Sequence, residues 1–237
     1  MIYLIPCTLG ETKIDDVLPR RNAEVIRLLR FFVVENVRTA RRFLKQVDRT
    51  IDIDAITFYE LNQHTDFKEL MVQMKDVWKE DIGVISEAGC PAVADPGALV
   101  VAEAQRRGIK VVPLVGPSSI LMSLMASGFN GQNFAFNGYL PIDKNERIAK
   151  IKQLEKRADS ERQTQIFIET PYRNLALMDD LCRTLQGATM LCVASGITTD
   201  AEWIRTKRVE EWRNGMKEIE KIQKIPTIFL LDSQKGK

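Results

Sequence analysis

Short apolar runs alternate with longer amphipathic segments from the first residue of the chain onward. In the first half, apolar runs bounded by turn residues predict strands over Ile2–Ile5, Phe31–Val34, Ile56–Tyr59, Ile82–Ile85 and Ile109–Leu114. A helix is clearest between the third and fourth run, where one face carries Phe67, Leu70, Met71, Met74, Val77 and Trp78. Strands that alternate with helices predict a parallel sheet covered by helices.

A turn-rich stretch, Ser127–Asn133, is typical of a boundary between lobes. We divide the chain into an N-terminal α/β lobe over residues 1–116 and a C-terminal α/β lobe over residues 117–237. Strands are predicted in the second lobe over Phe134–Gly138, Gln165–Glu169, Thr189–Ala194, Trp203–Lys207 and Thr227–Leu231, and helices over Lys144–Arg157, Asn174–Leu185 and Val209–Ile219. The close spacing of the later strands indicates hairpins, and therefore a mixed sheet.

Composition adds little about the partner. Of the 237 residues, 45% are apolar, enough for a core in each lobe, and the formal net charge of +2 sets up no strong field for a polyanion. The charge-rich segment Arg147–Arg162 is interpreted as a solvated helix face.

The cysteines and the single histidine narrow the chemistry. Cys7, Cys90, Cys182 and Cys192 are far apart in sequence, and no histidine is near enough to complete a zinc site, so no metal is predicted. His64 lies in a polar turn, which argues against a hydrolase triad. The start resembles no signal peptide, and no apolar run is long enough to span a bilayer, so we expect a cytoplasmic protein without a membrane partner.

The least ordinary loop, Ser86–Gly97, follows the strand predicted over Ile82–Ile85. It holds two glycines, two prolines and two carboxylates, and open α/β sheets bind ligands at the carboxyl ends of their strands. A purely structural Asp-Pro-Gly turn before a helix over Ala98–Arg107 explains it equally well.

Two further loops belong to the same predicted edge. Val115–Ile120 follows the fifth strand, with Ser118 or Ser119 available to cap a helix or to bind a ligand, and Pro6–Gly10 follows the first strand. Neither the GxGxxG nor the GxxxxGK[ST] pattern occurs, which argues against a dinucleotide or a P-loop nucleotide.

Six sequence blocks in one order carry a resemblance to a known family. They are Ile5-Pro-Cys-Thr-Leu-Gly10, Val34-Glu-Asn-Val-Arg-Thr39, Ser86-Glu-Ala-Gly-Cys-Pro91 with Asp95-Pro-Gly97, Val115-Gly-Pro-Ser-Ser119, Phe136-Asn-Gly-Tyr-Leu-Pro141 and Glu169-Thr-Pro-Tyr-Arg173. Together they resemble the tetrapyrrole methylase superfamily, and within it the bacterial branch that 2'-O-methylates a cytidine ribose of 16S ribosomal RNA. The match runs over nearly the whole chain.

The resemblance implies a two-lobe α/β fold of the tetrapyrrole methylase type, with a mostly parallel N-terminal sheet, a mixed C-terminal sheet and a ligand cleft between the lobes. It also implies a homodimer and S-adenosyl-L-methionine as the methyl donor. The residues that it assigns to the cofactor are Leu9, Ser86, Glu87, Ala88, Gly89, Ser118, Ser119 and Ile120 in the first part of the chain, and Leu140, Thr170, Pro171 and Pro226 in the second.

The blocks that the resemblance assigns to the cofactor are kept better than those that it assigns to the substrate, although the first block runs on as Gly10-Glu-Thr-Lys-Ile14 where the family has Gly-Asn-Leu-Gly-Asp. The family's Glu-Asp-Thr-Arg is Glu35-Asn-Val-Arg38 here, its His-Asn-Glu segment is replaced by Tyr59-Glu-Leu-Asn62, and its late Arg-Glu-Leu-Thr-Lys block is reduced to Ser195-Gly-Ile-Thr-Thr199. The sequence therefore supports the reaction, methyl transfer, better than it supports ribosomal RNA as the acceptor of the methyl group.

Methyl transfer needs no protein nucleophile, because a sulfonium methyl is already electrophilic and mainly needs an acceptor aligned with it. Glu35 is the candidate base for a ribose hydroxyl, with Glu60 as a second choice, but an ion pair between Glu35 and Arg38 is an equally good interpretation. The expected substrate-binding residues are Arg38, Glu60, Asn62, Tyr172 and Arg173. Alternatively, Thr170–Arg173 simply begins a helix.

A basic helix face formed by Arg38, Arg41, Arg42 and Lys45 is available for a phosphate backbone, or is merely solvated. Three functions stay open. They are a methyltransferase that acts on ribosomal RNA, free or in the small ribosomal subunit, a methyltransferase that acts on a tetrapyrrole or another small acceptor, and a non-catalytic protein that binds S-adenosylmethionine.

Overall fold

The apolar runs of the first half form a five-stranded sheet in which every pair of neighbours is parallel. The computed structural model describes residues 1–233. The strands are β1 (Ile2–Ile5), β2 (Phe31–Val34), β3 (Thr57–Glu60), β4 (Ile82–Ile85) and β5 (Val111–Pro113), in the order β3-β2-β4-β1-β5. Every residue of β4 is buried, as expected for a central parallel strand covered on both faces.

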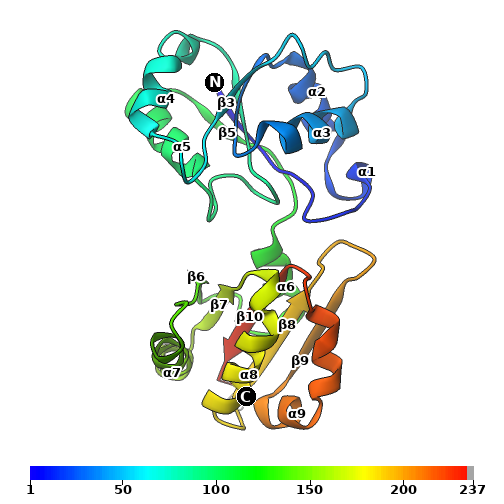
Figure 1. The fold of residues 1–237 in the computed structure, drawn as a ribbon, viewed down its shortest axis with the longest axis vertical. Helices are drawn as coiled ribbons and strands as arrows, with labels where there is room; N and C mark the ends of the chain where they lie inside the picture. Colours follow the sequence, from blue (N-terminus) through cyan, green and yellow to red (C-terminus); the bar gives the residue numbers. More distant parts are fainter. Residues whose placement is uncertain (234–237) are drawn as a thin grey trace. The chain divides into compact units, whose positions relative to one another are not determined.

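This sheet belongs to the first of two compact units, Met1–Ser118 and Ser119–Lys237. Figure 1 draws the first unit from blue to green and the second from green to red. The last four residues of the predicted C-terminal lobe, 234–237, lie outside the described residues.

Helices cover both faces of the first sheet. They are α1 (Ile14–Val17), α2 (Arg20–Leu28), α3 (Val37–Val47), α4 (Phe67–Gln73), the 3-10 turn η1 (Val77–Lys79) and α5 (Gly97–Arg106). Asn36 caps α3 by accepting hydrogen bonds from the backbone N of Arg38 and Thr39. One core cluster packs Phe32 and Ile5 against Leu44, and another packs Ile82 and Val84 against Met74 and Val100.

The helix expected to run from Phe67 to Trp78 is wrong in its extent. It ends at Gln73, and Trp78 lies in η1, so the apolar positions that suggested one face are divided between two short elements. Both elements still bury Leu70, Met74, Val77 and Trp78 in the same core cluster. The strand predicted over Ile109–Leu114 is also shorter, and α2 had not been predicted.

The second unit has a five-stranded mixed sheet with the order β6-β7-β10-β8-β9. β6 and β7 are parallel, and the other neighbours are antiparallel. Its elements are α6 (Ser119–Ser127), β6 (Phe134–Tyr139), α7 (Lys144–Ser160), β7 (Thr164–Ile168), η2 (Pro171–Arg173), α8 (Asn174–Thr184), β8 (Met190–Ser195), β9 (Trp203–Arg208), α9 (Val209–Asn214), η3 (Met216–Ile222) and β10 (Thr227–Asp232). The predicted α/β fold, with a parallel first sheet and a mixed second sheet, is confirmed.

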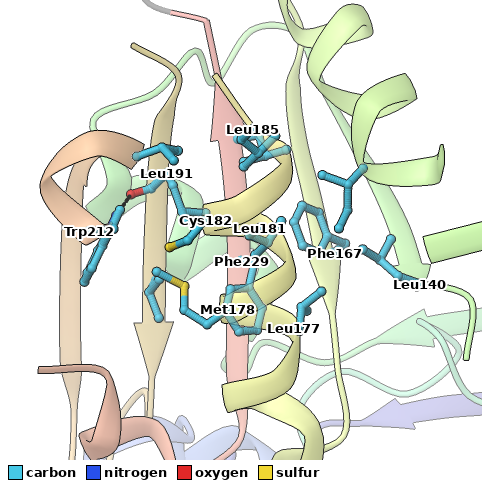
Figure 2. Close-up of a cluster of buried hydrophobic side chains, with 14 of the residues drawn as sticks. Leu140, Phe167, Leu177, Met178, Leu181, Cys182, Leu185, Leu191, Trp212 and Phe229 are labelled. Atoms are coloured by element: carbon cyan, nitrogen blue, oxygen red, sulfur yellow. Dashed lines mark hydrogen bonds between the residues drawn. The ribbon is translucent and has the colours of Figure 1, made fainter. Parts of the chain in front are cut away.

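The core of the second unit is centred on stacked aromatic rings. Phe167 of β7 and Phe229 of β10 lie with their ring centroids 5.9 Å apart, and Figure 2 shows Met178 and Leu181 of α8 beside them. Trp212 is fully buried, and its indole Nε1 donates to the carbonyl oxygen of Leu191 at 2.9 Å. Burying an indole with its N–H satisfied avoids the cost of an unpaired polar group.

One further prediction in this unit is wrong, because the helix expected over Val209–Ile219 ends at Asn214 and continues as η3 after Gly215 interrupts it. The solvated face expected over Arg147–Arg162 is confirmed for exposed residues such as Lys152 and Lys156. Arg147 is the exception, since its guanidinium donates from Nη2 at 2.7 Å and from Nε at 2.9 Å to Oδ2 of the buried Asp180. None of the helices in the described part of the chain combines the length and apolar character needed to cross a membrane.

Candidate functional site

The carboxyl ends of the parallel strands in the first unit carry a set of connected loops. Ile85 pairs with Ile5 on one side and with Val34 on the other, so β4, β1 and β2 end level at one edge of the sheet. The loop after β1 meets the loop after β4 where the backbone N of Cys7 donates to the Gly89 carbonyl at 2.9 Å. Such an edge is where open α/β sheets bind ligands.

The loop after β4 has an unusual backbone. Gly89 has a φ of +68°, and the non-glycine residues Ala92 and Ala94 have φ values of +65° and +59°. Left-handed conformations are costly for residues with a Cβ, and such strain concentrates at functional sites. A Cβ at Gly89 would lie 2.9 Å from Cδ2 of Leu9 and 3.4 Å from the carbonyl oxygen of Pro117, so the three loops meet around a bare backbone.

Asp95 holds the second half of this loop in shape. Its Oδ2 accepts from the backbone N of Ala92 at 2.8 Å, and its Oδ1 accepts from the backbone N of Gly97 at 2.6 Å. Burial raises the pKa of the Asp95 carboxyl, and these two hydrogen bonds oppose the rise. Asp95–Gly97 therefore fits the structural interpretation, a turn that begins α5. The part of the loop that is left as a candidate for binding a ligand is the part around Gly89.

Glu35 and Glu87 connect the ends of β2 and β4. Oε1 of Glu35 accepts from the backbone N of Glu87 at 3.0 Å, and Oε1 of Glu87 accepts from Oγ1 of Thr39 at 2.5 Å. Burial raises the pKa of the Glu35 carboxyl, the Glu87 amide lowers it, and the charges of Asp95 and Glu87 raise it again. The result is a half-buried carboxyl with an increased affinity for a proton.

The alternative in which Glu35 pairs with Arg38 is wrong. Within residues 1–233 no ion pair joins the two side chains, and Arg38 is exposed. Burial, followed by the charges of Glu87 and Glu35, also raises the pKa of the Cys7 thiol beneath the loops. Cys7 is therefore a buried packing residue rather than a reactive thiolate.

The end of β3 brings two more predicted residues to the start of α3. Oε2 of Glu60 accepts from the backbone N of Val37 at 3.4 Å, and Oε1 of Glu60 accepts from Nδ2 of Asn62 at 2.9 Å. Glu35, Arg38, Glu60 and Asn62 thus gather around the first turn of α3. Glu60 is exposed, which makes it the weaker candidate for a base.

In the second unit, the residues that the resemblance assigns to the cofactor lie along one edge of the mixed sheet. Leu140 follows β6, Thr170 and Pro171 follow β7, and Pro226 precedes the antiparallel β10. The carbonyl oxygen of Pro226 accepts from the backbone N of Gly196 at 3.0 Å. Leu140 is almost fully buried in the core of this unit.

Arg173 is already engaged by a buried acid. Oε1 of Glu169 accepts from Nη2 of Arg173 at 2.6 Å, from Nε at 3.0 Å and from the backbone N of Thr170 at 2.6 Å. Residues Pro171–Arg173 form the 3-10 turn η2, which leads directly into α8, so the interpretation of this block as a helix start fits. Tyr172 is 83% exposed and is free to stack on a partner.

Comparisons with known proteins show what this chain is similar to. No protein-family profile matches the chain. The chain is 28% identical over 206 residues to a protein of Vibrio cholerae named ribosomal RNA small subunit methyltransferase I, which covers 86% of this chain and 67% of that protein. It is 26% identical over 235 residues to the protein of the same name from Escherichia coli O157:H7, covering 99% of this chain and 78% of that protein.

Solved structures agree on the fold. The structure of the methyltransferase CobJ superimposes with a TM-score of 0.63 at 14% identity, covering 98% of this chain and 94% of that chain. The uroporphyrin-III C-methyltransferase of Thermus thermophilus, complexed with S-adenosylhomocysteine, superimposes with a TM-score of 0.54 at 16% identity, covering 98% of this chain and 96% of that chain.

The chain thus has the fold of these tetrapyrrole methyltransferases, and the relatives that it resembles in sequence are named as methyltransferases. The predicted resemblance is confirmed. The chain spans about two thirds to three quarters of the length of the curated relatives. The individual cofactor and substrate residues of this chain stay predictions.

Sequence reasoning missed two side chains that hold the candidate site in shape. Thr39 orients Glu87, and Asp95 fixes the strained half of the loop after β4. Both lie in sequence blocks that were already singled out, but their partners are 48 residues and 3 residues away, respectively. The contacts of Asp95 within its own loop could have been inferred from the Asp-Pro-Gly turn. The contact between Thr39 and Glu87 had no signal in the sequence.

Proposed function

We propose that the chain is an S-adenosylmethionine-dependent methyltransferase that methylates the 2'-hydroxyl of a ribose in ribosomal RNA. The observation that carries the proposal is the half-buried Glu35 at the loop edge of the parallel sheet, in a chain that matches ribosomal RNA methyltransferases over 86% and 99% of its length. A ribose hydroxyl is a weak acid, so its methylation benefits from a nearby group with an increased proton affinity.

The residues at this edge suit S-adenosylmethionine in charge. Gly89 presents a bare backbone where a Cβ would crowd Leu9 and Pro117, and Ser86, Glu87 and Ala88 come directly before it. The donor carries a positive sulfonium and an ammonium group, and Glu35, Glu87 and Asp95 supply negative charge at the same edge. Leu9 adds an apolar contact.

When it is bound, S-adenosylmethionine supplies an electrophilic methyl group that needs no protein nucleophile. The chain's own contribution is to position the acceptor, to exclude water and to take up a proton. Oε1 of Glu35 is held by the Glu87 amide, which leaves Oε2 as the atom that would accept the hydroxyl proton. Arg38 and Asn62 beside it are placed to hold the phosphate and sugar of a nucleotide.

The tetrapyrrole superfamily offers a second acceptor, because the solved structures with the same fold include enzymes named for uroporphyrin-III and precorrin. At identities of 12% to 15% these structures carry the fold only. Tyr172 on the second unit would stack equally well on a base or on a planar macrocycle. We therefore rank the tetrapyrrole second, and a non-catalytic binder of the donor third.

Calorimetry with S-adenosylmethionine and S-adenosylhomocysteine separates these possibilities first. Micromolar binding, about −8 kcal/mol, supports a donor site, and the absence of binding to the folded protein overturns the proposal.

Radiolabelled donor is then offered with deproteinised 16S ribosomal RNA, with small ribosomal subunits and with uroporphyrinogen. Label in RNA that resists alkaline cleavage at one position indicates 2'-O-methylation, and label only in the macrocycle favours the second candidate. Sedimentation equilibrium of the same sample tests the predicted homodimer.

A further inference from the structure

A groove on the first unit lies beside the second half of α3, the helix whose first turn carries the candidate site. Segment 12–15 and the second half of α3 enclose about 650 Å³. Its lining residues are Thr12, Lys13, Ile14, Asp15, Arg42, Lys45, Gln46, Val47 and Arg49. Four of them are cations and one is a carboxylate, so the groove carries a local charge of +3, more than the +2 of the entire chain.

The cations follow one face of α3. Arg38, Arg42 and Lys45 are spaced by four and three residues, which places them on one side of α3, and Arg49 follows the end of the helix. Arg38 lies in the first turn of α3, where Glu35 and Glu60 are found, and Arg49 lies just beyond its last turn. From Arg38 to Lys45 the positive stripe runs roughly 10 Å along α3 at 1.5 Å per residue, from the candidate catalytic edge to the groove.

Most of these charges have no partner among residues 1–233. Over the described residues, no hydrogen bond or ion pair engages the charged ends of Lys13, Arg42 or Arg49. Lys45 differs, because its Nζ donates to the carbonyl oxygens of Arg49 at 3.0 Å and Ile51 at 2.7 Å and so holds the turn after α3. Mutual repulsion among uncompensated cations is unfavourable unless a polyanion neutralises them.

We propose that this basic groove, together with Arg38, binds the phosphate backbone of the RNA substrate and leads it to Glu35. The inference rests on the proposed function and extends it from the acceptor hydroxyl to the neighbouring nucleotides. Charge complementarity favours RNA, because a line of cations along a helix matches a line of phosphates better than it matches a single small anion.

The test removes three charges and measures the salt dependence of RNA binding. The variant Lys13→Gln, Arg42→Gln, Arg49→Gln keeps Lys45, which has a structural role. The matched control Lys68→Gln, Lys75→Gln, Lys79→Gln removes the same charge from exposed positions of the same unit. Each phosphate contact contributes about 0.7 to 0.9 to the slope of log K against log salt, so the groove variant should lose about 2 from that slope.

We expect the groove variant to bind deproteinised 16S ribosomal RNA at least tenfold more weakly at 0.15 M KCl, and the control variant to bind it as the unaltered protein does. A charge-preserving variant, Lys13→Arg, Arg42→Lys, Arg49→Lys, should retain the full slope because a phosphate contact needs only the charge. S-adenosylhomocysteine affinity should be equal in all four proteins, which shows that the site itself is intact.

The outcomes separate the two proposals. If the unaltered protein binds the donor but no RNA, the RNA function fails and the groove assignment fails with it. If RNA binding persists in the groove variant with an unchanged slope, or falls equally in the control, only the groove assignment is overturned. Loss of binding to phosphatidylglycerol vesicles, with RNA binding retained, would likewise overturn it in favour of a membrane surface.

Discussion

Substitution of Gly89 by alanine tests whether the donor approaches the loop after β4. The new Cβ would lie 2.9 Å from Cδ2 of Leu9 and 3.4 Å from the carbonyl oxygen of Pro117, on a residue whose φ is +68°. The left-handed backbone alone should cost about 1 to 2 kcal/mol of stability. The Leu9 side chain is half-buried and can turn aside, so the fold should survive, but the space at the bare backbone is filled.

Gly108 provides a matched control in the same unit. Its φ is +69°, almost the same as that of Gly89, and a Cβ there would meet nothing within 4 Å. Gly108→Ala should therefore show the backbone cost without any steric overlap. The difference between the two variants isolates what the Cβ does at the loop edge.

Thermal unfolding and calorimetry with S-adenosylhomocysteine measure the two effects separately. Both variants should unfold at a lower temperature than the unaltered protein, Gly89→Ala by at least as much as Gly108→Ala. Only Gly89→Ala should bind the ligand at least tenfold more weakly, about 1.4 kcal/mol. Unchanged affinity in a folded Gly89→Ala protein would refute the placement of the donor at this loop. Equal loss of affinity in both variants would show a general effect of destabilisation instead.

Three further predictions follow from individual side chains. Glu35→Gln should reduce methyl transfer by about 10²- to 10⁴-fold with unchanged donor affinity. The activity of the unaltered protein should fall as pH decreases through the raised pKa of Glu35. Full activity of the variant would exclude Glu35 as the base. The same variant should not be less stable at pH 7 in urea unfolding, since a raised carboxyl pKa means that the charged form costs stability above that pKa. Arg147→Met should cost about 3 kcal/mol or more in urea unfolding by leaving Asp180 buried without its main partner, and replacing both residues by apolar ones should recover much of that loss. Asp48→Asn should destabilise the protein at pH 6 but not near pH 2, because hydrogen bonds from Thr50 and Arg27 lower the pKa of Asp48 to about 2. The stabilisation is present above the usual pKa of an aspartate and is lost as pH falls through the lowered pKa. A difference in unfolding free energy that stays constant from pH 6 to pH 2 would contradict the assignment.

The hydrophobic pattern by itself determined the fold class and the position of the candidate edge. Apolar runs of four residues, such as Ile82–Ile85, can only be satisfied by burial on both faces, which requires a parallel sheet between helices. Once β1, β4 and β5 are parallel, the loops after them must lie at one edge. The unusual composition of Ser86–Gly97 then singled out one of those loops as the candidate site without any structure.

Tertiary structure alone decided which side chains act together. Glu35 is only three residues from Arg38, yet it accepts a hydrogen bond from the amide of Glu87, 52 residues away, because the register of β2 against β4 brings the ends of these strands level. Similarly, the charge pattern of Arg147 suggested solvent, and Asp180 of α8 buried it in an ion pair. Periodicity fixes which face of an element is buried, but the partner of each polar group depends on which strands and helices are neighbours, and that is a property of the whole fold.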